Sequence, residues 1–107
     1  MIEVTKDNFE TEVLKETGKP VMVDFWGPKC ALCLTLMPHV EKLAHKYSDK
    51  IKVVKMNITG NVLFCAKAGL KIMGLPTFIF FENGKEVKRL TGQITAEDLE
   101  KAVEEAL

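Results

Sequence analysis

One stretch of the chain, residues 21–38, constrains its fold more than any other. It begins with an apolar run over residues 21–26, which favours a strand buried on both faces. The chain then turns at Gly27-Pro28 and continues with the apolar spacing of a helix, whose first turn contains Cys30 and Cys33. A strand, a short turn and a helix in this order indicate an α/β fold built from βαβ units.

The positions of the two cysteines predict unequal thiols. Backbone N–H groups at the start of a helix lack intrahelical partners and carry the positive end of the helix dipole. A thiolate at Cys30, near the N-cap and beside Lys29, would accept hydrogen bonds there, so we expect its pKa below the free-thiol value of about 8.5. Cys33 lies one turn further in and is expected to stay protonated longer. Thiol–disulfide exchange requires this arrangement, because the first thiol attacks and the second resolves the mixed disulfide.

Zinc binding is the alternative for the same two cysteines. Structural zinc needs four ligands, usually two such pairs or one pair with two histidines. No second Cys-x-x-Cys occurs, and His39 and His45 follow Cys33 by six and twelve residues. The two histidines would lie about 240° and 120° around the helix from Cys33, so neither shares its face. The sequence therefore favours a redox pair over a zinc site or inert core thiols, and we expect no metal.

Asp24 is the one acid inside the apolar run. A carboxylate in a strand buried on both faces is costly unless it is paired or protonated. One interpretation is an edge position that leaves Asp24 in water. The other is a buried acid or base beneath Cys33, with its pKa raised by desolvation.

The chain resembles the thioredoxin family over essentially its whole length. The shared motifs are Val23-Asp24-Phe25-Trp26, Cys30-x-x-Cys33, Pro38 five residues after the second cysteine, Gly74-Leu75-Pro76-Thr77, Asn83-Gly84 and Gly92. The resemblance implies the thioredoxin fold, with a central five-stranded mixed sheet of order 1-3-2-4-5 flanked by four helices. It also implies protein-disulfide oxidoreductase activity.

The same resemblance assigns roles to particular residues. It implies that Cys30 is the nucleophile and Cys33 the resolving thiol of a redox disulfide. Asp24 and Lys55 match the family's buried proton-transfer pair, and Pro76 matches its cis-proline facing the disulfide. We expect five residues to form the substrate surface around the cysteines: Trp26, Lys29, Leu32, Leu75 and Pro76.

Two departures from the family pattern lie beside the cysteines. The usual Gly-Pro between them is Ala31-Leu32 here, and the usual tryptophan before the first cysteine is Lys29. Both positions shape the redox potential and the substrate surface. The resemblance therefore indicates the reaction class, but not the strength of the couple or the choice of partners.

Length and composition limit the class of protein. The 107 residues predict one domain over residues 1–107, and fifteen basic and fifteen acidic residues cancel, so no general affinity for nucleic acid or membranes is expected. The odd third cysteine, Cys65, argues against a secreted fold held by disulfides. No apolar run approaches the ~20 residues that span a bilayer. Since the first six residues show no signal-peptide character either, we expect a cytoplasmic monomer.

Periodicity and turn residues predict the remaining elements. In chain order they are a strand at 2–4, a helix beginning at Thr5 or Asp7, the strand 21–26, a helix at 30–47, a strand at 51–58, a helix with a loop within 59–71, a strand at 75–81, a hairpin to a strand at 86–90, and a last helix capped by Thr95. Lys55 is unusual in a core strand, and two interpretations are open. Either its aliphatic stem lies over apolar surface with the ammonium in water, or, as the family resemblance implies, it pairs with Asp24. Cys65 is either a small apolar filler or a second redox-responsive thiol.

The leading hypothesis is a cytosolic dithiol carrier that reduces protein disulfides through Cys30 and Cys33. It would need no cofactor of its own and would be recharged by a reductase of the thioredoxin reductase type. One alternative is a thioredoxin-like protein restricted to particular partners, with a shifted potential, which Lys29 and Leu32 motivate. The other is a non-catalytic binding module on the same fold, against which the intact cysteines, Asp24 and Pro76 argue.

Overall fold

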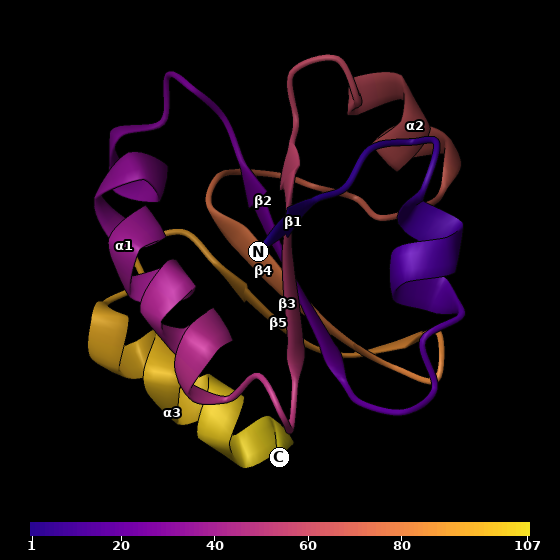
Figure 1. The fold of residues 1–107 in the computed structure, drawn as a ribbon. Coiled ribbons are helices and arrows are strands. Elements are labelled where there is room, and N and C mark those ends of the chain that lie inside the picture. Colours follow the sequence, from indigo (N-terminus) through magenta and orange to yellow (C-terminus); the bar gives the residue numbers. More distant parts are fainter.

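The chain folds around a five-stranded mixed sheet, and the computed structural model describes all of residues 1–107. The strands are β1 (Ile2–Glu3), β2 (Val21–Trp26), β3 (Lys52–Asn57), β4 (Thr77–Glu82) and β5 (Lys85–Thr91). They lie in the order β1-β3-β2-β4-β5 (Figure 1). β1, β3 and β2 run parallel, whereas β4 is antiparallel to β2 and β5 is antiparallel to β4. The predicted sheet and its strand order are thus confirmed.

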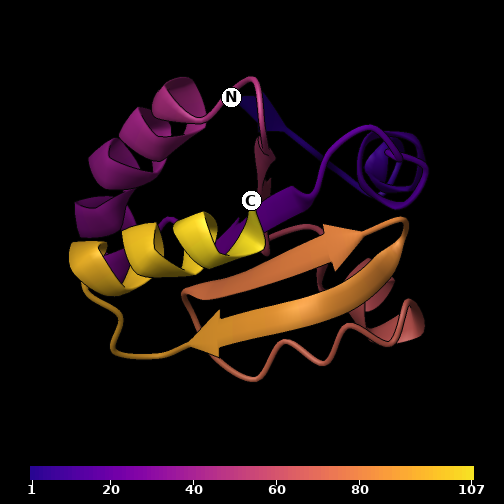
Figure 2. The same cartoon turned by 90° about the horizontal axis from the view of Figure 1, so that it is seen from below.

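Four helical segments flank this sheet, as the family resemblance implied. They are the π-helical turn η1 (Glu10–Leu14), α1 (Ala31–Lys46), α2 (Val62–Lys67) and α3 (Ala96–Ala106). α1 and α3 cover one face, and η1 and α2 cover the other, so the sheet is the middle of three layers (Figures 1 and 2). None of these helices combines the length and the apolar character needed to cross a membrane.

The alternation of side chains along the strands separates two hydrophobic cores. In β2, Val21, Val23 and Phe25 pack on the side of η1 and α2, whereas Met22 packs on the side of α1 and α3. β2 is paired at both edges, by β3 and β4, and the two cores, with the helices behind them, cover both of its faces. This central position explains the nearly continuous apolar sequence of the strand, and the alternation turns Asp24 toward α1.

The second α-helix is shorter than the 59–71 segment in which it was predicted. α2 ends in a Schellman motif, in which the Leu70 N–H donates to the Cys65 carbonyl and the Gly69 N–H to the Ala66 carbonyl, each at 3.1 Å. Gly69 supplies the positive φ of 72° that this ending needs. Leu70 and Cys65 are buried in the same core. The helix therefore stops where its last turn meets the core.

Two local motifs form as the sequence predicted. At the start of α3, Thr95 Oγ1 accepts from the Asp98 N–H at 3.0 Å, and Asp98 Oδ2 accepts from the Thr95 N–H at 3.1 Å. This capping box satisfies two N–H groups that the helix leaves free. Between β4 and β5, Asn83 and Gly84 both have positive φ, at 51° and 81°, as a two-residue hairpin turn requires.

We expect Gly84→Ala to destabilise the fold by more than its positive φ alone explains. A Cβ on Gly84 would lie 2.7 Å from the carbonyl oxygen of Leu14, so the hairpin or the end of η1 must move. Gly60→Ala is the matched control, because Gly60 has a similar φ of +86° but no atom lies within 4 Å of the added Cβ. In urea unfolding, the control should lose about 1–2 kcal/mol and Gly84→Ala roughly 2–4 kcal/mol. Equal losses would contradict this steric argument.

Candidate redox site

The candidate site lies where β2 ends. The chain turns after Trp26, and the Cys30 N–H donates to the Gly27 carbonyl at 3.1 Å, which closes the turn before α1. A Cβ on Gly27 would lie 3.1 Å from Leu75 Cδ1 and 3.5 Å from Ile58 Cγ2. Glycine at this position therefore lets the segment before β4 and the end of β3 pack against the turn that carries the cysteines.

Cys30 and Cys33 are joined by a disulfide, and their Cα atoms lie 5.2 Å apart. Cys30 is the N-cap of α1, and its half-buried Sγ accepts a hydrogen bond from the Cys33 N–H at 3.2 Å. Cys33 is buried, with 1% of its surface exposed. The two cysteines thus differ in burial: Cys30 is half-buried at the helix start, and Cys33 is buried within the first turn.

A pocket of about 450 Å³ opens beside Cys30. Two of the predicted substrate-surface residues, Lys29 and Leu75, line it with Cys30 itself, whereas Trp26, Leu32 and Pro76 do not. The remaining lining residues are Gly27, Pro28, Ile58 and Thr59. Ile58 and Thr59 directly follow β3 and were not predicted from the sequence to lie at the site. The carboxyl ends of parallel strands meet at one edge of a sheet. Applied to the strand predicted at 51–58, this rule would have placed Ile58 and Thr59 near the cysteines.

The other three predicted substrate-surface residues lie close to this pocket in the sequence. Leu32 is half-buried and packs against the core under α1. Trp26, the last residue of β2, is also half-buried. Pro76 is buried directly before β4, and the Leu75–Pro76 peptide bond is cis, which confirms the expected isomer.

Asp24 is buried in the central strand, with 1% of its surface exposed. Burial therefore excludes the interpretation of a solvated edge position. Oδ1 of this carboxyl has no hydrogen-bond partner. Desolvation raises the pKa of Asp24 to about 7; the charge of Lys55 opposes this rise, and the charge of Glu3 adds to it. A carboxyl of this kind exchanges protons near neutral pH.

Lys55 is the neighbour of Asp24 in the β2–β3 register, but its ammonium does not form an ion pair with Asp24. Its Nζ instead lies 3.9 Å from Glu3 Oε1 and 5.7 Å from the centroid of the Trp26 ring. The expectation of a direct Asp24–Lys55 pair is thus wrong. Lys55 is only the register neighbour of Asp24, and its charge is turned toward β1. The place of Glu3 beside Lys55 could not be predicted from the sequence, because the register of so short a strand as β1 is not evident from its residues.

Cys65 takes no part in this site. It is buried, and its thiol lies 3.8 Å from the sulfur of Met56. Burial also raises the pKa of this thiol. These features support a small apolar filler over a second redox-responsive thiol.

A disulfide at the start of a helix, open on one side to a pocket and backed by a buried carboxyl on the same side of the sheet, is typical of thiol–disulfide oxidoreductases. No group of three or more His, Cys, Asp or Glu side chains is arranged to hold a metal ion.

Comparison with known proteins identifies the family. The family model described as Thioredoxin matches residues 1–105. Thioredoxin 1 of Synechococcus elongatus is 38% identical over 91 residues, which cover 85% of this chain and 82% of that protein. Thioredoxin of Acetoanaerobium sticklandii is 36% identical over 104 residues, which cover 96% of this chain and 96% of that protein. Thioredoxin 1 of a Nostoc species is 35% identical over 105 residues, which cover 98% of this chain and 95% of that protein.

The chain belongs to the thioredoxin family. It is a dithiol–disulfide oxidoreductase, and Cys30 and Cys33 are its redox-active pair.

We expect Asp24→Asn to stabilise the oxidised protein at neutral pH and above. The pKa of Asp24 is about 7 in the folded chain, against an ordinary 3.8, so its ionisation opposes folding. This cost is absent below about pH 4, grows as the pH rises, and is complete above about pH 7, where it amounts to at most roughly 4 kcal/mol. Guanidinium unfolding at several pH values should show the advantage of the variant growing across this window. A variant less stable than the parent at pH 8 would instead make Asp24 a structural partner.

Proposed function

We propose that this protein reduces disulfide bonds of other proteins, with Cys30 as the attacking thiolate and Cys33 as the resolving thiol. One observation carries this proposal: the half-buried Cys30 sulfur caps α1 beside an open pocket, whereas Cys33 is buried behind it. The disulfide of a substrate protein can therefore approach Cys30 but not Cys33. The Cys33 N–H, which donates to Cys30 Sγ, is placed to stabilise the thiolate of the reduced form.

The reaction then has two exchange steps. The Cys30 thiolate attacks one sulfur of the substrate disulfide; an S–S bond forms between them, and the other substrate sulfur leaves with the electron pair and takes up a proton. Cys33 loses its proton and attacks Cys30 Sγ, which expels the remaining substrate sulfur and forms the Cys30–Cys33 disulfide. Two electrons have passed to the substrate, which is released as a dithiol.

We assign Asp24 the role of proton acceptor for Cys33, directly or through water. Both residues are buried on the α1 side of the sheet. A pKa of about 7 lets the Asp24 carboxyl accept and release a proton at neutral pH. Lys55 would tune this proton affinity through its charge, since it is the register neighbour of Asp24.

The segment before β4 would position the substrate chain. Neither the N–H nor the C=O of Leu75 is engaged in any hydrogen bond of the fold, and its side chain lines the pocket beside Cys30. Free backbone groups at this place support pairing with an extended stretch of the substrate. Trp26, Leu32 and Pro76 would complete the surface around this contact.

The proposal includes partners and a compartment. A reductase of the thioredoxin reductase type would return two electrons to the Cys30–Cys33 disulfide. We place the protein in the cytoplasm, where a Cys-x-x-Cys pair is typically catalytic and a free thiol such as Cys65 stays reduced. We further propose that it acts as a monomer.

Lys29 favours a second candidate within the same chemistry, a protein restricted to particular partners. The side chain is exposed and lines the pocket beside Cys30, where the family usually has a tryptophan. A cation at this rim favours acidic substrate segments over apolar ones. Comparing acidic and basic peptide disulfides as substrates tests this restriction.

The first test uses cysteine variants. Cys33→Ser should attack disulfide substrates and then remain as a mixed disulfide through Cys30, whereas Cys30→Ser should trap little. Cys65→Ser is the matched control and should behave like the parent, because Cys65 is buried away from the site. Non-reducing gels and mass spectrometry would count the trapped complexes. Faster alkylation of Cys33 or Cys65 than of Cys30 in the reduced parent at neutral pH would overturn the assignment of roles.

The second test concerns the direction of electron flow. We expect a reducing couple, near the family's usual range or somewhat less reducing, because Ala31-Leu32 supplies no charge that would further stabilise the thiolate. The protein should therefore accelerate insulin reduction by dithiothreitol and come to equilibrium with glutathione mostly in the disulfide form. No acceleration would favour the non-catalytic binding module, and a potential like that of a periplasmic oxidant, about −120 mV, would reverse the proposed direction.

A further inference from the structure

One row of residues across the sheet carries three charged side chains. Glu3 of β1 is the register partner of Lys55 of β3, and Lys55 is in turn the partner of Asp24 of β2. The next residue in the row, Phe78 of β4, is apolar. Register partners carry their side chains on the same face of a sheet. Lys55 therefore has a carboxyl on either side.

Lys55 is turned toward Glu3. Its Nζ lies 3.9 Å from Glu3 Oε1, and it makes no ion pair with Asp24. Glu3 Oε2 accepts hydrogen bonds from the Trp26 indole N–H at 3.2 Å and from the Asn57 backbone N–H at 2.9 Å. These two donors hold the carboxylate in place, so one side chain of β1 fixes the positions of groups on both β2 and β3.

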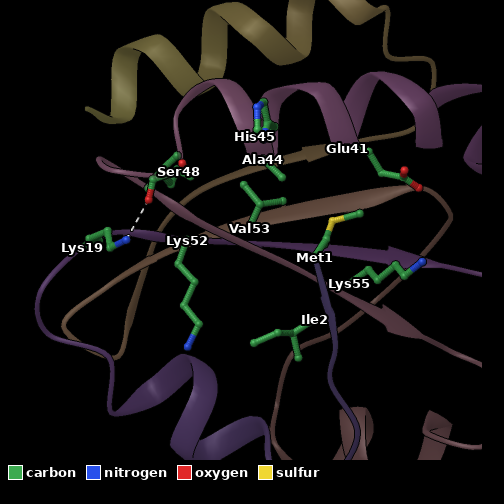
Figure 3. A pocket seen from close by; sticks show the side chains of 11 residues that line it. Met1, Ile2, Lys19, Glu41, Ala44, His45, Ser48, Lys52, Val53 and Lys55 are labelled. Atoms are coloured by element: carbon green, nitrogen blue, oxygen red, sulfur yellow. Dashed lines mark hydrogen bonds between the residues drawn. The ribbon is translucent and has the colours of Figure 1, made fainter.

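Packing alone does not fix the Lys55 side chain. It lines a pocket of about 570 Å³ between α1 and the edge of the sheet, together with Met1, Ile2, Glu41 and Val53 (Figure 3). A quarter of the Lys55 side chain is exposed. The open space leaves other positions for the ammonium, so its contacts with Glu3 and with the face of the Trp26 ring define where it lies.

We propose that Glu3 is a positioning residue of the redox reaction, which holds the Lys55 ammonium at the edge of the sheet and so prevents it from pairing with Asp24. This inference rests on the proposed role of Asp24 as proton acceptor for Cys33. An ammonium beside Asp24 would stabilise its carboxylate and make it a weaker base. Because Glu3 keeps that ammonium away, the carboxyl stays a base strong enough to take the Cys33 proton.

The charged groups that face Asp24 come from several elements. β1 contributes Glu3 and β3 contributes Lys55, and their charges act on the pKa of Asp24 in opposite directions. α1 carries Cys33, which does not titrate while the disulfide is intact. β4 adds no charge in this row, because its residue there is Phe78. Glu41 of α1 lines the same pocket as Lys55 and is the other acid that a released ammonium would meet.

Glu3→Gln tests this inference, because the amide oxygen can still accept from Trp26 and Asn57 while the negative charge is lost. The readout is the titration midpoint of the Asp24 carboxyl carbon, followed by ¹³C NMR in the oxidised protein and assigned with Asp24→Asn. From about 7 in the parent, we expect the midpoint to fall by about 0.5 pH unit or more, the size expected when a nearby unit charge is removed and an opposite charge approaches.

Glu12→Gln is the matched control. Glu12 also pairs with a lysine of β3, since Lys52 Nζ lies 3.0 Å from its Oε1. Lys52 is an odd number of residues from Lys55 and points to the opposite face of the sheet. The midpoint of Asp24 should therefore stay at the parent value. Circular dichroism and thermal melting of both variants would establish that the fold is retained.

A double-mutant cycle with Lys55→Met separates the two ways in which Glu3 could act. If Glu3 works by restraining Lys55, Glu3→Gln lowers the midpoint more in the parent than in the Lys55→Met background. Equal shifts in the two backgrounds would mean that Glu3 acts only through its own charge, and they would overturn the inference. An unchanged midpoint in Glu3→Gln would overturn it as well.

The rate of mixed-disulfide resolution distinguishes failure of this inference from failure of the proposed function. Where the inference holds, the pH profile of resolution in Glu3→Gln is displaced to lower pH together with the NMR midpoint. If Asp24→Asn resolves as fast as the parent, the proton-transfer role of Asp24 fails, and this inference fails with it. If Asp24→Asn is slow but the cycle shows no coupling, the role of Asp24 stands and only the part assigned to Glu3 falls.

Discussion

The hydrogen-bonded position of β2 between β3 and β4 is the constraint on which the rest of the structure depends. It pairs both edges of the strand, places Asp24 in the interior between the two helical layers, and sets the turn at Gly27 against Leu75 and the end of β3. α1 starts from that turn, so its N-cap Cys30 and Cys33 in its first turn lie at the carboxyl edge of the parallel strands. Open α/β sheets bind their ligands at this edge.

Asp24 is buried in this frame without a hydrogen bond to its Oδ1, and this costs stability. Pairing Asp24 with a cation would lower the cost of burying it, but it would also lower its proton affinity. The lysine at the adjacent register position makes no ion pair with Asp24, and its ammonium lies 3.9 Å from Glu3 Oε1. Functional sites commonly keep a destabilising group where the chemistry needs it.

The two departures from the family pattern, Ala31-Leu32 and Lys29, occupy different places in the fold. Ala31 and Leu32 lie in the first turn of α1 and add no charge near the sulfurs. The redox potential of the cysteine pair therefore depends on the helix start and on the buried carboxyl. Lys29 lies at the rim of the pocket beside Cys30. Lys29 thus adds a charge beside the pocket, whereas Ala31 and Leu32 add none.

Local sequence determined much of this protein: the strand–turn–helix with its two cysteines, the Asn83-Gly84 hairpin and the Thr95 capping box. These features follow from residues a few positions apart, whose propensities and hydrogen bonds act within one turn. Only the tertiary structure decided that Asp24 is buried, that Ile58 and Thr59 line the pocket, and that Lys55 turns to Glu3. Such contacts join segments tens of residues apart. They depend on strand register and on the space left by packing, which the spacing of residues along the chain does not specify.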